Sequence, residues 1–422
     1  MRQLRQLILE LIPPSIFRAL QSPYHFLLAL FGALWYRFPS RRMLVIGVTG
    51  TKGKSTTAEL INATFEEAGF STALANTIRF KIGVESRQNR FKMTMPGRFF
   101  LQKFLRQAVD ASCSVAILEM TSEGVKQSRH KFIALDALVF TNLSPEHIES
   151  HGSFENYAAA KLKLAQALAR SPKRKRVIVA NADDPFGERF LAEASPAEKH
   201  PFRLEDANPF TLGGDGIDFQ FAGAEMHSPL IGAFNLYNLL AAASLAESFG
   251  IGTETIVRAF KKVARIPGRV EYIANDRAFS IIVDYAHTAD SLRALYEAFP
   301  NIKKICVLGA TGGGRDQWKR SLMGKVADQY CAHAIVTDED PYDEDPSTIT
   351  MDVAKGFSKL KPEIIIDRRA AIRRALTIAK KGDAVLITGK GTDPYIMKAY
   401  GEKLPWSDAA VAREELALLP RL

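Results

Sequence analysis

An apolar segment, a glycine-rich loop and a helical pattern follow one another directly in this chain, and this order restricts the fold most. The segment Met43–Val48 has the length and composition of a buried strand, and the helical pattern Lys54–Ala68 begins just after Gly53. The loop between them belongs to the motif Gly47–Thr57, GVTGTKGKSTT. Backbone N–H groups at a helix N-terminus bind phosphate groups, and glycines let the backbone approach them. The order predicts a phosphate-binding loop at the edge of an α/β sheet.

Short apolar segments then alternate with helical patterns, which is typical of parallel sheets covered by helices. Helices are expected at Lys54–Ala68 and Phe154–Ala169, and another from Asn235 to Gly250. The polar, glycine-rich stretch 201–227 predicts a small antiparallel excursion. The expected strands of this first α/β domain are Met43–Val48, Ser114–Met120, Ala137–Leu143 and Arg176–Ala182.

A second α/β domain is expected after Ile266-Pro267-Gly268, where a helix should end. The predicted organisation is a leader at 1–42, a central domain at 43–265 and a C-terminal domain at 266–422. The expected strands of the C-terminal domain are Ala278–Tyr285, Lys304–Ala310, Ala332–Asp338 and Ala384–Gly391.

The leader contains the apolar run His25–Tyr36, with Arg37 after it. A bilayer-spanning helix needs about 20 apolar residues, so this run is too short. No small-residue cleavage site follows, which argues against a signal peptide. Two interpretations stay open: a helix that packs on the body of the protein, or a helix whose Trp35, Tyr36 and flanking arginines contact a membrane surface.

Composition excludes several classes of protein. The chain is 47% hydrophobic and 24% charged, which is typical of globular proteins rather than disordered ones. Its net charge of +10 suits anionic phosphate substrates, and no nucleic-acid motif accompanies it. Cys113, Cys306 and Cys331 have neither metal-site spacing nor an even count, so we expect reduced core thiols of a cytoplasmic protein. A monomer is the expected oligomeric state.

The loop residues have individual expected roles. Lys54 should reach the β- and γ-phosphates of ATP, and Ser55 should offer its hydroxyl to Mg²⁺. The spacing departs from the strict P-loop, because Val48 occupies the place of the first glycine. The expected nucleotide-binding residues of the loop are Gly50, Thr51, Lys52, Gly53, Lys54, Ser55 and Thr56.

With this spacing, G-T-x-G-K-[ST] after GVT, the loop resembles the ATP loop of the Mur ligases and folylpolyglutamate synthetases. Glu119 ends a strand and is similar in position to the Mg²⁺ carboxylate of that family, although a carboxylate there is often only solvated. The stretch Thr141–Ala165 resembles the family pattern TNL…DH…HG…Y…AK. By that resemblance His147 is a ligand of a second metal ion, and Lys161 is the lysine that several members carbamylate. Alone, either residue would be interpreted as structural.

Further matches follow in the family's order. Asn181–Pro185 resembles a structural turn. The asparagines Asn235 and Asn238 resemble a pair that lies near the adenine, and Asn235 is also a good helix N-cap. Arg269 is similar to an arginine of the phosphate region at the domain junction. Asp284 and His287 resemble residues that meet ATP when the C-terminal domain closes.

The last matches are similar to the branch of the family that adds the third residue of the bacterial cell-wall peptide. That branch has DNPR where this chain has Glu339–Tyr342, EDPY, and GKGHE where it has GKGTD. Tyr342 lacks the charge of the family arginine that binds the distal carboxylate of diaminopimelate, whereas Asp393 keeps a carboxylate for a substrate ammonium. The resemblance implies substrate-binding roles for Thr94, Ser122, Arg315, Asp340, Tyr342 and Asp393.

The resemblance implies an ATP- and Mg²⁺-dependent ligase that adds a diamino acid, such as diaminopimelate or lysine, to a muramoyl dipeptide in peptidoglycan synthesis. The expected catalytic residues are Lys54, His147, Lys161 and Arg269. Family members of this branch begin with a domain of roughly a hundred residues for the UDP-sugar, and this chain has the leader in its place. The alternatives are a folylpolyglutamate synthetase-like ligase and a membrane-associated nucleotide-binding protein, either an ATPase or non-catalytic.

Overall fold

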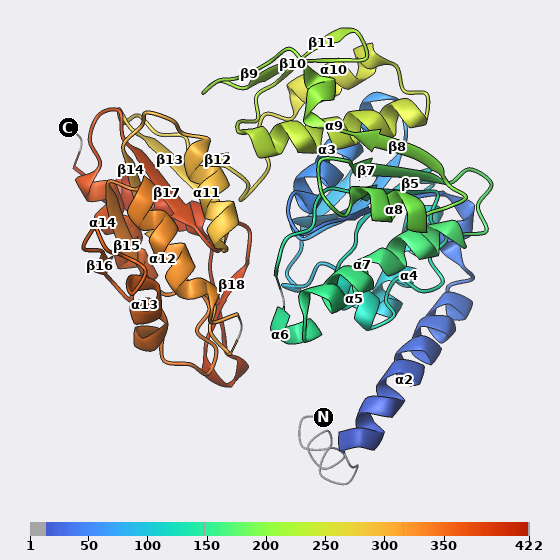
Figure 1. The fold of residues 1–422 in the computed structure, drawn as a ribbon, viewed down its shortest axis with the longest axis horizontal. Helices are drawn as coiled ribbons and strands as arrows, with labels where there is room; N and C mark the ends of the chain where they lie inside the picture. Colours follow the sequence, from blue (N-terminus) through green and yellow to red (C-terminus); the bar gives the residue numbers. More distant parts are fainter. Residues whose placement is uncertain (1–13, 147, 315, 421–422) are drawn as a thin grey trace.

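The computed structural model describes residues 14–146, 148–314 and 316–420, and shows two α/β bodies side by side (Figure 1). The first contains an eight-stranded sheet in the order β4-β3-β2-β5-β1-β6-β7-β8. Six of its strands are parallel, and β3 and β4 are antiparallel additions at one edge. The strands are β1 Leu44–Thr49, β2 Thr72–Ala75, β3 Arg79–Ile82, β4 Glu85–Gln88, β5 Val115–Glu119, β6 Ala137–Phe140, β7 Val177–Asn181 and β8 Glu198–Phe202. The predicted parallel sheet is confirmed.

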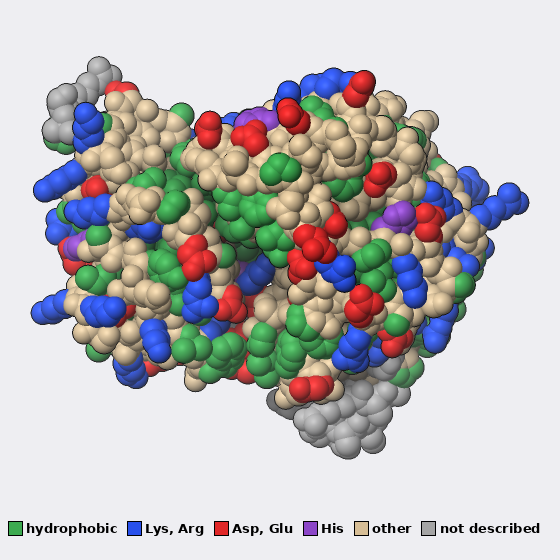
Figure 2. Space-filling model, turned by 45° about the horizontal axis from the view of Figure 1, so that its top comes forward, with side chains coloured by type: hydrophobic (Ala, Val, Ile, Leu, Met, Phe, Trp, Pro, Cys, Tyr) green, Lys and Arg blue, Asp and Glu red, His purple; other side chains and the backbone are tan. Residues whose placement is uncertain are grey.

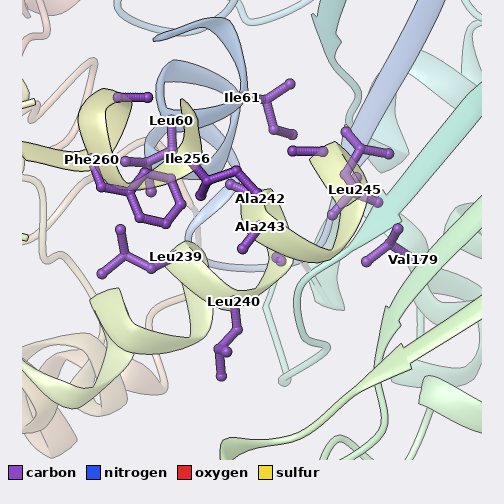
Figure 3. Close-up of a cluster of buried hydrophobic side chains, with 14 of the residues drawn as sticks. Leu60, Ile61, Val179, Leu239, Leu240, Ala242, Ala243, Leu245, Ile256 and Phe260 are labelled. Carbon is purple, nitrogen blue, oxygen red and sulfur yellow. The ribbon is translucent and has the colours of Figure 1, made fainter. Parts of the chain in front are cut away.

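Helices cover both faces of this sheet, because successive strand residues point to opposite faces. Ile46 and Ile117 face the core formed with α3, α9 and α10, whereas Val45 and Leu118 face the core formed with α4 and α7. Figure 3 shows Leu60 of α3, Leu239 of α9 and Phe260 of α10 packed together in the first core. The helices are α3 Lys54–Glu67, α4 Arg98–Asp110, α5 Ser122–Lys126, α6 Ile148–His151, α7 Phe154–Ala169, α8 Gly187–Glu193, α9 Ala233–Ser248 and α10 Thr253–Lys262.

The glycine-rich stretch forms a separate antiparallel sheet, as predicted. It consists of β9 Phe210–Leu212, β10 Ile217–Phe221 and β11 Ala224–Ser228, after the short helix η2 Leu204–Ala207. Ile217 and Phe219 of β10 are buried and join the core that contains the buried residues of α9. This sheet therefore extends the first α/β body.

The second body has a six-stranded sheet in the order β12-β13-β17-β14-β15-β16, parallel except for β12. One face packs on α11–α13 and the other on α14 and α15. The strands are β12 Glu271–Tyr272, β13 Ser280–Asp284, β14 Lys304–Leu308, β15 His333–Val336, β16 Glu363–Ile364 and β17 Ala384–Thr388. The helices are α11 Ala289–Glu297, α12 Lys319–Tyr330, α13 Pro346–Ala354, α14 Arg368–Ile378 and α15 Asp408–Leu418. A hairpin of β18 Tyr395–Met397 and β19 Lys403–Pro405, joined through η3 Ala399–Gly401, completes it.

Two cysteines of the second body form a disulfide, so the prediction of reduced thiols is wrong for them. Cys306 lies on β14 and Cys331 directly follows α12, and their Cα atoms are 6.1 Å apart. Only Cys113 is a free, buried thiol, as expected. The two partners are 25 residues apart in the sequence, and only the packing of α12 on the sheet brings them together.

The leader forms a helix, α2 Pro14–Trp35, followed by η1 Pro39–Arg42. Figure 1 shows α2 projecting from the first body. Its C-terminal half packs on α4, where Ala29 and Ala33 are buried. Among the described residues, no helix combines the length and apolar character that crossing a bilayer needs. Residues 1–13 of the leader lie outside the described part of the chain.

Candidate functional site

A cavity of about 530 Å³ lies between the two bodies, and Figure 2 shows the surface hollowed there. The loop that follows β1 forms one wall, at the carboxyl end of the parallel strands, and β13 and the segment before β12 supply the other. Its lining contains these residues singled out in the sequence: Thr51, Lys52, Gly53, Lys54, Ser55, Thr56, Thr94, Glu119, Asn235, Asn238, Arg269, Asp284, His287 and Asp393.

Two glycines give the loop its shape. Gly53 has a φ of 80°, and a Cβ there would lie 2.2 Å from Asn238 Oδ1. A Cβ on Gly50 would lie 2.0 Å from Thr141 Oγ1. Both positions therefore require glycine for close approach as well as for backbone conformation. The loop therefore lies closely against Thr141, which follows β6, and against Asn238 of α9.

Lys54 is the first residue of α3, and it lines the wall of the cavity that the phosphate-binding loop forms. Its Nζ donates a hydrogen bond to the Thr51 carbonyl at 2.9 Å. Burial lowers the pKa of Lys54, and the carboxylates of Glu119 and Glu146 oppose that shift. The ammonium lies where phosphate oxygens approach a helix N-terminus, which suits the predicted phosphate contact.

Ser55 and Glu119 meet as the sequence predicts for a magnesium site. Ser55 Oγ donates to Glu119 Oε2 at 2.9 Å, and the same carboxylate oxygen accepts from the backbone N–H of Thr77 at 2.8 Å. A hydroxyl and a carboxylate beside a phosphate loop are the oxygen donors that Mg²⁺ prefers. Within the described residues, no three His, Cys, Asp or Glu side chains group as a metal site. His147 lies outside the described residues.

Lys161 of α7 contacts the backbone of the phosphate-binding loop. Its Nζ donates to the Gly50 carbonyl at 2.6 Å and lies 4.9 Å from the ring centroid of Tyr157. Burial, and then the nearby Lys54 ammonium, lower the pKa of Lys161 well below its usual value. The structure thus brings the lysine to the phosphate loop, where it binds backbone.

The side chains of Asn235 and Asn238 form a series of hydrogen bonds near the start of α9. Gly232 is the N-cap of this helix, so the structural alternative of Asn235 as N-cap is wrong. Asn235 Nδ2 donates to the Ile231 carbonyl at 2.8 Å, and Asn238 Nδ2 donates to Asn235 Oδ1 at 3.1 Å. Thr57 Oγ1 donates to Asn238 Oδ1 at 3.1 Å, which connects the pair to α3.

Arg269 joins the two walls of the cavity. It lies before β12, its guanidinium carbon is 4.4 Å from the ring centroid of Tyr285, and its Nη2 is 3.5 Å from Ser55 Oγ. Asp284 accepts from the backbone N–H groups of Val270 and Ala286 at 2.8 and 2.7 Å, which fixes the turn that carries Arg269. Burial raises the pKa of Asp284, while the charge of Arg269 opposes this.

His287 makes a second connection between the bodies. Its Nε2 is 3.1 Å from Glu146 Oε1, and the same carboxylate oxygen accepts from Lys52 Nζ at 3.0 Å. The backbone N–H of Lys52 donates to Asn142 Oδ1 at 2.9 Å. Sequence reasoning did not single out Glu146 or Asn142, although both lie inside the Thr141–Ala165 match, which was their only signal.

Two lysines and two aspartates form a charge cluster, defined by Lys92, Asp340, Lys390 and Asp393, at the far end of the cavity, where Lys92 and Asp393 line it and Asp340 and Lys390 are buried. Lys390 Nζ donates to Asp340 Oδ1 at 2.8 Å and lies 3.4 Å from Asp393 Oδ2. Lys92, from the loop after β4, pairs with Asp340 across the domain boundary and lies 3.4 Å from Asp393. Burial alone raises the pKa of Asp340, but the two ammonium groups more than offset it, so that pKa lies below its usual value.

Of the remaining predicted substrate residues, Tyr342 lies beside this cluster, and the others lie elsewhere or outside the described residues. The ring centroid of Tyr342 is 5.9 Å from Lys92 Nζ, and Thr94 Oγ1 is 2.8 Å from Thr77 Oγ1. Ser122 is buried at the start of α5, 3.2 Å from His151 Nε2, and does not line the cavity. Arg315 lies outside the described residues. Lys92 was missed because its loop has no recognisable pattern.

Comparison with known protein families matches residues 48–246 to the Mur ligase middle domain and residues 268–391 to the Mur ligase glutamate ligase domain. The chain belongs to the Mur ligase family. The predicted family, fold class and ATP-dependent acid–amino acid ligase activity are thereby confirmed. The two matched regions correspond to the two walls of the cavity.

Curated relatives point to one branch of the Mur ligases. The chain is 35% identical to a UDP-N-acetylmuramoyl-L-alanyl-D-glutamate–2,6-diaminopimelate ligase of Syntrophomonas wolfei, over 92% of this chain and 81% of that protein. It is 36% identical to a UDP-N-acetylmuramyl-tripeptide synthetase of a Roseiflexus species, over 93% of this chain and 82% of that protein.

Solved structures agree on the fold. A UDP-N-acetylmuramoyl-L-alanyl-D-glutamate–2,6-diaminopimelate ligase superposes with a TM-score of 0.61 at 29% identity, over 89% of this chain and 78% of that one. A Mycobacterium tuberculosis folylpolyglutamate synthase superposes with a TM-score of 0.73 over 95% and 96% of the chains, at 17% identity. That second likeness shows a shared fold alone.

Proposed function

We propose that this Mur ligase joins a diamino acid to a carboxylate of a muramoyl dipeptide in peptidoglycan synthesis, with ATP as the energy source. The observation that carries the proposal is the cavity itself, which has a phosphate-binding loop on one wall and the Lys92–Asp340–Lys390–Asp393 cluster at its far end. The names of the relatives at 35 and 36% identity support the same step.

The first half of the reaction takes place at the loop. The substrate carboxylate attacks the γ-phosphorus of ATP, an O–P bond forms, the bond to the β-phosphate oxygen breaks and ADP leaves. Lys54 and the backbone N–H groups of the loop stabilise the phosphate charge, and Arg269 approaches from the opposite wall. The hydroxyl of Ser55 and the carboxylate of Glu119 fit a magnesium ion, which would neutralise phosphate charge when bound.

The second half takes place between the walls. The amino group of the diamino acid attacks the acyl carbon, the bond to the phosphate oxygen breaks, and phosphate and a proton are released as the amide forms. Asp340 and Asp393 orient the substrate ammonium groups, because buried carboxylates form strong charge-assisted hydrogen bonds. Diaminopimelate is the first amine to test, since two relatives' names include it or its tripeptide product, and lysine is the second.

Lys161 has a further role in this proposal. In the family pattern that it matches, the lysine is carbamylated and becomes an oxygen ligand for a second magnesium ion, together with the residue at position 147. Carbamylation requires the neutral amine as nucleophile toward CO₂, and a wholly buried lysine beside Lys54 supplies it. Intact-mass measurement under bicarbonate, with Lys161→Arg as the control, tests this assignment.

The deciding experiment is phosphate release from ATP with purified full chain. Release should require both a muramoyl dipeptide and a diamino acid, and the amide product should appear in equal amount by mass spectrometry. ATP hydrolysis at full rate without either substrate would contradict the ligase step. UDP-linked and lipid-linked dipeptides are compared in parallel, with a folate and glutamate as the control pair. We also propose that the enzyme acts as a monomer in the cytoplasm, where ATP is supplied.

A further inference from the structure

The solvent-facing side of α2 is apolar. Five large side chains are more than half exposed, and each has another of the five three or four residues away, which places them on one side of a helix. Their exposed fractions are 58% for Tyr24, 60% for Leu27, 52% for Phe31, 54% for Leu34 and 67% for Trp35. We call these five residues the α2 stripe. None of the ligase residues described above belongs to it.

The opposite face of α2 is packed, so the stripe is held in place by the fold. Ala29 and Ala33 are buried, and the rings of Phe26 and Phe132 lie 5.2 Å apart. Phe31, at the edge of the stripe, is 5.7 Å from the ring of Phe99 on α4. Figure 1 shows α2 directed away from the body of the protein. The stripe is therefore a fixed, accessible apolar surface.

The charged residues that follow the stripe in the sequence are basic. The sequence of α2 contains no acidic residue, and Arg37, Arg41 and Arg42 follow it with exposed side chains. Lys103 is also exposed on α4, one helical turn after Phe99. Leucine and phenylalanine between tyrosine and tryptophan, with arginines beside them, match the interfacial region of a bilayer whose headgroups are anionic.

We propose that the α2 stripe lies in the surface of an anionic lipid membrane and holds this Mur ligase there peripherally. The apolar side chains enter the boundary between headgroups and acyl chains, and Arg37, Arg41 and Arg42 contact lipid phosphates. A second copy of the chain is a poorer occupant, because neither α2 helix carries an acid to pair with these arginines, and parallel pairing would also bring the two sets of arginines together.

Vesicle co-sedimentation of the full chain tests the proposal. The protein should pellet with phosphatidylcholine vesicles that contain about 30 mol% phosphatidylglycerol, and less with pure phosphatidylcholine or in about 0.5 M NaCl. The triple variant Leu27→Gln/Phe31→Gln/Leu34→Gln should lower the partition coefficient about tenfold or more. The matched control Val84→Gln/Tyr400→Gln changes two side chains that are 97% and 91% exposed elsewhere, and it should pellet like the parent.

Tryptophan fluorescence gives a second readout at the stripe. In the variant Trp318→Phe/Trp406→Phe only Trp35 emits, and its emission should shift to the blue when anionic vesicles are added. Ligase activity in solution should be equal in parent and triple variant, which separates this proposal from the proposed reaction.

Three results would overturn the proposal. They are the absence of pelleting by the full chain, equal pelleting of the triple variant, and a concentration-dependent doubling of mass that the triple variant abolishes while vesicles bind neither form. The last result would assign the stripe to a second copy of the chain.

Discussion

The two ends of the cavity are built in different ways. At the phosphate end, Gly53 and Lys54 are neighbours in the sequence, and the backbone conformation before a helix N-terminus gives the loop its shape. At the amine end, Lys92, Asp340 and Lys390 come from three distant segments and from both bodies, and ion pairs between their side chains join them. The loop at the first end lies within one domain and Arg269 reaches it from the other, whereas the ion pairs of the second end exist only where the two domains meet.

The largest expected effect is at the phosphate end. Lys54→Met should lower kcat on the order of 10³-fold, because a buried cation that stabilises transferring phosphate is lost. ATP-dependent phosphate release and amide formation should fall together. Lys103→Met, which removes an exposed lysine far from the loop, is the matched control and should retain parental rates. A variant of Lys54 with near-parental kcat would show that the backbone alone suffices.

The second largest effect is expected for Glu119→Gln, which should lower kcat about 10²-fold and raise the magnesium concentration that the enzyme requires. The amide can still accept from Ser55 Oγ, which now donates at 2.9 Å, so the fold of the loop is preserved. Initial rates over a magnesium titration measure the effect. An unchanged magnesium dependence would exclude Glu119 as a ligand.

Asp393→Asn should act at the other end of the cavity and raise KM for the diamino acid about tenfold or more, with KM for ATP unchanged. Loss of a charge-assisted hydrogen bond to an ammonium costs about 1.5–3 kcal/mol. Asp393→Glu keeps the charge and should recover part of the loss. Equal changes in KM for both substrates would show that the two ends of the cavity are not separable.

The smallest expected effect is a shift in pH dependence. Lys92 and Lys390 hold the pKa of Asp340 below its usual value, so the stabilising interactions of this carboxylate are present at neutral pH and are lost as pH falls through that lowered pKa. Lys92→Met should raise the pKa of Asp340, so that the loss begins at a higher pH. Denaturant unfolding and kcat/KM for the amine, both measured from about pH 4 to pH 7, report the shift. An acid limb that does not move would contradict a direct contact between Lys92 and Asp340 in solution.

Much of the fold follows from local sequence patterns. The apolar segments that became β1, β5, β13 and β17 were long and clearly bounded, so their prediction was confirmed. Strands β2, β3 and β4 were missed because no long apolar run marks them, and β4 is exposed along its whole length. Asparagine is a favoured residue type at helix N-caps, which suggested Asn235. The N-cap of α9 is instead Gly232, where the chain turns with a φ of 89°.

The sequence by itself determined the phosphate loop, the order of the two α/β domains and the pairing of Ser55 with Glu119, because these depend on short-range patterns and on the common edge of parallel strands. Only the tertiary structure decided that Cys306 and Cys331 pair, that Lys92 reaches Asp340, and that one face of α2 is buried while the other is exposed. Each of these results depends on how elements distant in the sequence pack, and packing distances leave no local pattern.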